Sequence, residues 1–317
     1  MTDRRIYIKA ATQISIQQPL SEQWMTTPVA YAEPYARSID PNFREWLNPL
    51  ESRRMGKILK RALVTAQKVM ADAGCSQPDA VITGTGLGCI ENTELFLSQL
   101  CREGEEMLKP TCFMQSTHNT ISSLIAIHSH IHGYNTTFSH KSVSFDSALL
   151  DAFTQLRLGD LQTALVTGND EMTPSYFSIL QRTGYIGQPG EVTAGEASVA
   201  LLLATDPEDA LCELEQVSMH YGDALPQLPP VDADTLLVVG TNGTPQNDEP
   251  YEQLCPSIDA RPRFAYKRLF GECYTASGLG VYAAAHLLHH GKAGRVLFVN
   301  HSDGRNVAFA LLKAIRK

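Results

Sequence analysis

The sequence has no long apolar segment and no surplus of basic residues. Nowhere along its 317 residues do about eighteen apolar residues follow one another, so we expect no transmembrane helix. The N-terminal stretch MTDRRIYIKAATQIS has neither the apolar core nor the small-residue cleavage site of a signal peptide. With 26 basic and 34 acidic residues the net charge is −8, which argues against a general nucleic-acid binder. The sequence therefore predicts a cytoplasmic protein with no membrane or nucleic-acid partner.

Cysteine and glycine motifs for disulfides, metals or nucleotides are also missing. The seven cysteines are scattered and no two of them form a CxxC pair. An odd number of cysteines in a long chain does not suggest a disulfide framework and fits a reducing compartment. Gly84, Gly86 and Gly88 make a glycine-rich turn, but the full GxGxxG fingerprint of a dinucleotide site is absent. We predict no cofactor.

Histidines occur in two groups, and neither has the spacing of a known metal motif. His118, His128, His130 and His132 come without an HExxH sequence, and we interpret them as polar surface or interface. The second group, His286, His289 and His290, lies near the end of an expected helix, where positive charge complements the helix dipole. We predict no metal site.

What the sequence does contain is an alternation of strand and helix patterns. We expect strands near residues 5–11, 79–84, 135–141, 162–168, 196–204, 212–219, 234–239, 295–299 and 306–312. We expect helices near residues 55–73, 92–103, 118–131, 146–158 and 277–290. Such alternation predicts an α/β fold with mostly parallel sheets covered by helices on both faces.

The order of elements partly repeats, which suggests an internal duplication. We place the N-terminal half at residues 1–206 and the C-terminal half at residues 207–317. Only residues 220–233 join the first two strands of the second half, and they contain three prolines. This connection is too short and too broken for a helical crossover, so we expect the C-terminal half to be trimmed.

Several segments carry a resemblance to one family. Residues 133–171 match its third strand, following helix and TALVTGNDE strand without a gap, and later matches are Gly195-Glu196-Ala197, Lys267, Gly271, Gly278, Gly304 and Asn306. In these the chain resembles the β-ketoacyl-ACP synthases of the thiolase fold. The resemblance implies two βαβαβαββ halves in an α-β-α-β-α arrangement of layers.

The family's catalytic positions, carried over one by one, fall on different residue types here. The nucleophilic cysteine, at a strand-to-helix elbow, falls on Ser142, or on Phe145 if the alignment slips by three residues. The two histidines that stabilise the developing negative charge fall near Asn242 and on Glu272, while the lysine remains as Lys267. A serine hydroxyl needs an adjacent base to attack a thioester, and a carboxylate is not a neutral donor.

A frame that matches the family but lacks the Cys-His-His set resembles the chain-length-factor-like subunits, including those of aryl polyene pathways. The resemblance implies polyketide or fatty-acid-like biosynthesis on acyl carrier protein, with a catalytic ketosynthase as partner in a heterodimer. It implies little condensation activity for this chain alone. The family's acyl pocket or interface would be lined here by Phe113, Ser116, His118, Asn119 and Phe145.

Other interpretations stay open at this point. Ser142 could act as the nucleophile of an acyltransferase or hydrolase, with His140 on the same face of the strand. The chain could instead be an acyl-binding homodimer. Lys267 and Glu272 could transfer protons or form a structural ion pair.

Two surface features bear on partners. The family pairs the strand near residues 135–141 across a two-fold axis, and an unpaired edge strand there is a physical reason to expect a dimer. A basic cluster on and before the first long helix could receive an acidic carrier protein or form a solvated face. Its members are Arg53, Arg54, Lys57, Lys60 and Arg61.

Overall fold

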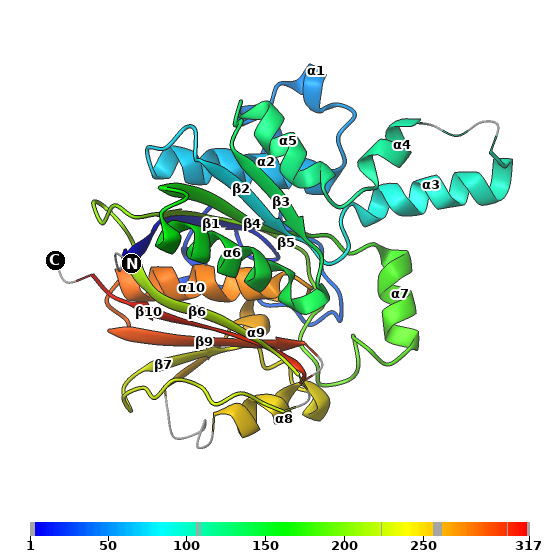
Figure 1. The fold of residues 1–317 in the computed structure, drawn as a ribbon. Coiled ribbons are helices and arrows are strands. Elements are labelled where there is room, and N and C mark those ends of the chain that lie inside the picture. Colours follow the sequence, from blue (N-terminus) through cyan, green and yellow to red (C-terminus); the bar gives the residue numbers. More distant parts are fainter. Residues whose placement is uncertain are drawn as a thin grey trace.

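The computed structural model describes residues 4–105, 108, 110–222, 224–255, 262–302 and 304–315. Within these residues ten strands form one sheet in the order β3-β2-β4-β5-β1-β6-β10-β9-β7-β8 (Figure 1). The strands of the first half are β1 (Ile6–Ile14), β2 (Ala80–Gly84), β3 (Tyr134–Phe138), β4 (Thr163–Asp170) and β5 (Ala197–Ala204). Those of the second half are β6 (Cys212–Tyr221), β7 (Leu236–Val239), β8 (Arg263–Ala265), β9 (Arg295–Ser302) and β10 (Asn306–Lys313).

The sheet consists of two halves with the same topology. Read from the outer edge inward, the first half is β3-β2-β4-β5-β1 and the second is β8-β7-β9-β10-β6. Strands β1 and β6 join the halves through a short antiparallel pairing of Ile6–Ile8 with Cys212–Leu214. The expected duplication therefore appears directly in the strand order.

The expectation of mostly parallel sheets is wrong. Strand β2 pairs in parallel with β3 and β4, and β7 pairs in parallel with β8 and β9. The remaining pairings are antiparallel, because β5 and β10 each turn back along the strand before them in the chain. Antiparallel neighbours need no helical crossover, so the last two strands of each half follow one another without a long helix packed on the sheet.

The helices form three layers around the two half-sheets. Helices α2 (Lys57–Asp72) and α5 (Thr120–His128) cover the outer face of the first half-sheet, and α8 (Pro245–Leu254) covers the outer face of the second. Helices α6 (Ser144–Leu158) and α10 (Ala276–His289) lie between the two half-sheets (Figure 1). The α-β-α-β-α arrangement is confirmed.

The central position of α10 follows from its composition. Residues 276–285 are all buried, as expected for a helix that is apolar on all sides. Its glycines allow the neighbouring elements to approach closely. A Cβ on Gly278 would lie 2.5 Å from Val199 Cγ1 and 2.9 Å from the Phe145 ring, so no larger residue fits there.

The second half is trimmed where the sequence predicted. In the first half α2 lies between β1 and β2, whereas no described helix lies between β6 and β7. The sequence missed β8, α8, α7 (Pro174–Arg182) and α9 (Tyr266–Phe270). Helices α3 (Ile90–Glu103) and α4 (Pro110–Gln115) project from the sheet as an arm (Figure 1), and α1 (Pro49–Ser52) is a single turn. None of the described helices has the length and apolarity needed to cross a membrane.

One member of the expected basic cluster is not at the surface. Arg61 is 1% exposed, and its guanidinium contacts Asp40 at 2.5 Å and Glu196 at 2.9 Å. Burial alone would lower the pKa of Arg61, but the two carboxylates outweigh it and raise that pKa. Arg61 therefore fastens the proline-rich segment before α1 to the turn that precedes β5, and only the rest of the cluster can meet a partner.

We predict that Gly84→Ala lowers the free energy of unfolding by about 1–3 kcal/mol, the usual cost of overpacking. A Cβ at Gly84 would lie 2.5 Å from the backbone of Ser144 and Phe145, where neither the strand nor the helix can move aside. Urea unfolding followed by circular dichroism measures the change. Gly294→Ala is the control, since nothing lies within 4 Å of its added Cβ. Equal stability of the two variants would contradict the prediction.

Candidate functional site

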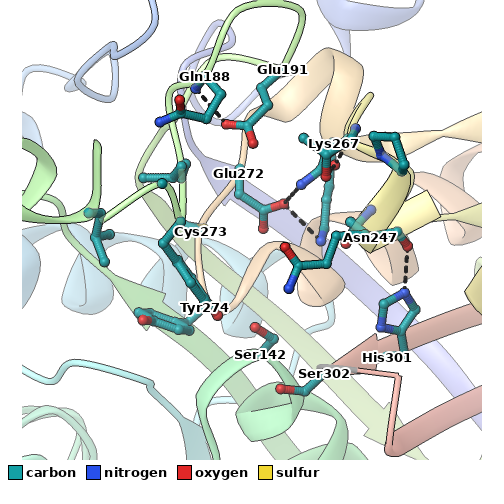
Figure 2. Close-up of a pocket in the computed structure, with 18 of the residues that line it drawn as sticks. Ser142, Gln188, Glu191, Asn247, Lys267, Glu272, Cys273, Tyr274, His301 and Ser302 are labelled. Atoms are coloured by element: carbon teal, nitrogen blue, oxygen red, sulfur yellow. Dashed lines mark hydrogen bonds and ion pairs between the residues drawn. The ribbon is translucent and has the colours of Figure 1, made fainter. Parts of the chain in front are cut away.

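A cavity of about 490 Å³ lies where elements of both halves meet. It is lined from the first half by Ser142 and by residues of the segment 172–191, and from the second half by residues of 242–250, 267–274 and 301–302. All four positions carried over from the catalytic set line this cavity: Ser142, Asn242, Lys267 and Glu272. The fold therefore brings together residues that lie far apart in the sequence (Figure 2).

Ser142 occupies a tight elbow between β3 and α6. The strand ends at Phe138, and residues Lys141–Val143 form a 3-10 turn directly before α6. Lys141 has a φ of 50°, which is uncommon for a residue with a side chain and marks a sharp change of direction. Phe145 lies one turn further on, buried in the core and outside the lining of the cavity.

The prediction that Ser142 and His140 lie on the same face of a strand is wrong, because the strand has already ended at Phe138. His140 is turned to another residue instead, with its Nδ1 2.9 Å from Ser147 Oγ. Among the described residues, none forms a side-chain hydrogen bond with Ser142 Oγ. The serine thus lacks the oriented base that a nucleophile of this type requires.

Lys267 and Glu272 form an ion pair in the wall of the cavity, with Nζ and Oε2 2.9 Å apart. Asn242 donates a second contact to the same carboxylate oxygen at 3.2 Å. Burial would lower the pKa of Lys267, but the Glu272 charge outweighs burial and raises it. Lys267 is therefore held as a cation. Oε2 of Glu272 is engaged by both Lys267 and Asn242 (Figure 2).

The loop that holds Asn242 is fixed by its own hydrogen bonds. Asp248, in the first turn of α8, accepts from the backbone N–H groups of Asn242 at 2.8 Å and Gly243 at 3.1 Å. The Asn242 side-chain oxygen accepts from the backbone and hydroxyl of Thr244. The amide is thus oriented with its NH₂ toward Glu272, so it acts as a donor and has no titratable proton to transfer.

The sequence analysis missed His301 and Cys273, which also line the cavity. Among the described lining residues His301 is the one histidine, and its ring is held by backbone groups: Nε2 lies 2.8 Å from the Asn247 carbonyl, and Nδ1 accepts from Gly304 at 3.3 Å. Burial raises the pKa of Cys273 well above its usual range, so the thiol stays protonated and is a poor nucleophile. Cys273 directly follows Glu272 in the sequence, and His301 directly follows Asn300. This adjacency was the one feature of the sequence that could have indicated them.

Below Ser142 a buried polar network supports the elbow. Asn300 donates from Nδ2 to the Ser142 carbonyl and to Asp146 Oδ2, both at 2.8 Å. Its side-chain oxygen accepts from the Tyr266 hydroxyl at 3.0 Å. Asp146 is fully enclosed, and burial raises its pKa to about 6 against the opposing hydrogen bonds. The network links α6, β9 and α9 at one point.

Four of the residues expected at a tunnel or interface lie outside this cavity. Phe113 is 57% exposed on α4, and His118 and Asn119 are exposed in the loop before α5. Ser116 is half-buried, and none of the four lines the cavity. They lie on the side of the molecule formed by the arm, α5 and the edge strand β3 (Figure 1).

Comparison with known proteins agrees with this architecture. The model of the β-ketoacyl synthase N-terminal domain matches residues 22–228, which is more than half of the chain. None of the curated proteins matches the sequence significantly. The protein belongs to the β-ketoacyl synthase family.

Solved structures show the same fold over nearly the whole chain. The ishigamide ketosynthase/chain length factor has a TM-score of 0.82 at 17% identity, covering 99% of this chain and 100% of that one. The ketosynthase ApeO in complex with its chain length factor ApeC from Xenorhabdus doucetiae has a TM-score of 0.76 at 15% identity, covering 98% of each chain. A type II polyketide acyl carrier protein complex with its ketosynthase, AntDE:AntF, has a TM-score of 0.79 at 11% identity, covering 99% and 100%.

We predict that Asp146→Asn stabilises the protein more at high pH than at low pH. The folded pKa near 6 lies above the ordinary 3.8, so the contribution of Asp146 to stability is present below about pH 4 and lost as pH rises through about 6. The gain from the substitution should therefore grow by about 2–3 kcal/mol between about pH 4 and about pH 8. Urea unfolding at both pH values measures it. The exposed Asp160, replaced by Asn, should show no such growth; a flat difference for Asp146→Asn would refute the assignment.

Proposed function

We propose that this chain is a non-condensing, chain-length-factor-type partner of a catalytic ketosynthase, acting in polyketide or fatty-acid-like biosynthesis on acyl carrier protein. The observation that carries the proposal is the set of hydrogen bonds and ion pairs among the residues that line the cavity. At the position to which the resemblance assigns the nucleophile, Ser142 has no base among the described residues. At the two positions assigned to the imidazoles, Asn242 and Glu272 contact each other, and Glu272 is also paired with Lys267.

The chemistry of condensation supports the same conclusion. A ketosynthase needs a thiolate to take the acyl chain and neutral donors to stabilise the enolate that forms on decarboxylation. Here Glu272 would place a negative charge where negative charge must develop, and Cys273 keeps its proton. Lys267 and Glu272 are paired with each other, so neither group is free to transfer a proton.

One face of the molecule is suited to a protein partner. Strand β3 is the edge of the sheet and pairs only with β2 among the described strands. Exposed apolar side chains lie on the arm, on α5 and on β3 itself: Leu95, Leu97, Phe113, Met114, Ile127 and Tyr134. An open edge with an apolar surround favours association. Two of the similar structures are described as ketosynthases with chain length factors, which supports a ketosynthase in that place.

A condensation assay with malonyl- and acyl-carrier protein tests the function. We expect no condensation from this chain alone, and activity only when a ketosynthase with an intact Cys-His-His set is present. Ser142→Ala should leave the activity of the complex unchanged. Ser142→Cys should not give activity to the isolated chain, because His301, the one histidine among the described lining residues, has both ring nitrogens engaged by backbone groups. Condensation by the isolated wild type, or labelling of Ser142 by a serine-reactive probe that Ser142→Ala abolishes, would overturn the proposal.

Charges placed on the β3 face should prevent assembly. We expect the double variant Ile127→Asp, Tyr134→Asp to fold but to lose copurification with the ketosynthase, since two carboxylates would be desolvated in an apolar interface. Tyr221→Asp is the matched control, because Tyr221 is an exposed tyrosine at the end of β6 in the other half of the sheet. Size-exclusion chromatography with light scattering measures assembly. If the control dissociates as readily as the double variant, the β3 face is not the interface.

A further inference from the structure

A second cluster of polar side chains lies at the far end of α10 from the cavity described above. The helix begins at Ala276 next to that cavity and ends at His289, so the two places are roughly 20 Å apart along the helix axis. The cluster consists of Glu22, His286 and His290. The histidines are spaced i, i+4 and share one face of the helix, whereas Glu22 comes from the segment that follows β1.

The three side chains converge with the spacing of metal ligands. One ligand atom from each lies within 4.8 Å of the others. Glu22 Oε1 is 3.2 Å from His286 Nδ1, and Glu22 Oε2 is 2.5 Å from His290 Nε2. Two ligands on a tetrahedral zinc ion, with bonds of roughly 2.0–2.1 Å, lie about 3.3 Å apart. The distance between Glu22 and His286 already has this value.

The state of His286 is the second, independent observation. Its Nε2 lies 3.1 Å from the Ala11 carbonyl, so Nε2 carries a proton and Nδ1 is left to offer its lone pair. The residue is 4% exposed, and among the described residues Nδ1 has no hydrogen-bond partner despite the nearby Oε1. A buried nitrogen oriented in this way by a backbone carbonyl is the usual arrangement of a metal-bound histidine.

We propose that Glu22, His286 and His290 bind one divalent transition-metal ion of the zinc class. Two imidazoles and one carboxylate form a known three-residue zinc set that leaves one coordination position open. Glu22 and His286 also line a cavity of about 380 Å³, together with Asp72 and Asp209, which leaves room for water at the open position.

The ion would connect two distant parts of the chain. Glu22 precedes Trp24, whose indole N–H donates to the Tyr282 hydroxyl at 3.0 Å, and Tyr282 donates to the Ser21 carbonyl at 3.1 Å. The segment around Glu22 is therefore already seated on α10, and the metal adds a coordinate link one turn further along the helix. Because such an ion binds the folded chain, it should raise thermal stability.

The test uses the full chain, prepared without a polyhistidine tag and stripped of metal with a chelator. Titration with Co²⁺ should give the visible absorption of a tetrahedral site with one ion per chain, and Zn²⁺ should displace it. His290→Ala and Glu22→Gln should each weaken Zn²⁺ affinity by at least about tenfold, and the rise in melting temperature on adding Zn²⁺ should vanish. Both positions are partly exposed, so these variants should fold where His286→Ala could fail.

The matched control is His289→Ala, which removes an exposed imidazole next to His290 that is not in the ligand set. This variant should bind Zn²⁺ as the wild type does. Equal weakening by His289→Ala and His290→Ala would mean that exposed histidines capture the ion. Absence of the Co²⁺ absorption, with an unchanged melting temperature, would mean that Glu22 and the histidines form an ion pair only. Either result overturns the proposal, and neither affects the proposed role beside a ketosynthase.

Discussion

The enclosure of Phe145 by three glycines is the constraint on which the rest of the structure depends. Gly84 on β2, Gly168 on β4 and Gly278 on α10 each approach Phe145 so closely that an added Cβ would lie 2.5–2.9 Å from its backbone or ring. This contact sets the depth at which α6 and α10 lie between the two half-sheets. Because interiors are packed without spare volume, the same contact fixes where α6 begins. The elbow that carries Ser142 is therefore positioned by the apolar core and needs no catalytic chemistry to persist.

Because the apolar core positions the elbow, the fold does not depend on which reactive side chains stand at the cavity. The N-terminal end of α6 brings Asp146 next to Asn300, and the Asn300 amide donates a hydrogen bond to its carboxylate. A buried polar atom without such a partner would be costly. Lys267, also buried, needs a counter-charge, and Glu272 supplies one at 2.9 Å. On the proposed assignment, Glu272 in place of a neutral imidazole would remove the electrostatic support for an enolate. The carboxylate also stabilises the cation of Lys267, so the proposed loss of condensation is compatible with retention of the fold.

The sequence predicts most of the fold because its apolar periodicity is strong where elements are buried. The strand at 80–84 and the helices at 57–72 and 144–158 lie within two residues of their expected bounds. Strand β8 and helix α9 were missed, since a three-residue strand and a five-residue helix are too short to show a period. Arg61 was misplaced for a different reason. Its neighbours Lys57 and Lys60 follow the pattern of a solvated face. The sequence around Arg61 does not indicate that Asp40 and Glu196, which are distant along the chain, form ion pairs with it.

The site shows the same division between local and non-local information. Family spacing predicts Ser142, Asn242, Lys267 and Glu272, and the fold places them around one cavity. The hydrogen bonds that decide their chemistry depend on orientation: His301 faces Asn247 and Gly304 rather than the serine, and His140 faces Ser147. Glu22 and His286 meet only because the segment after β1 crosses α10. Residue type at a position predicts what chemistry is possible there, whereas the tertiary partners of each polar atom determine whether that chemistry takes place.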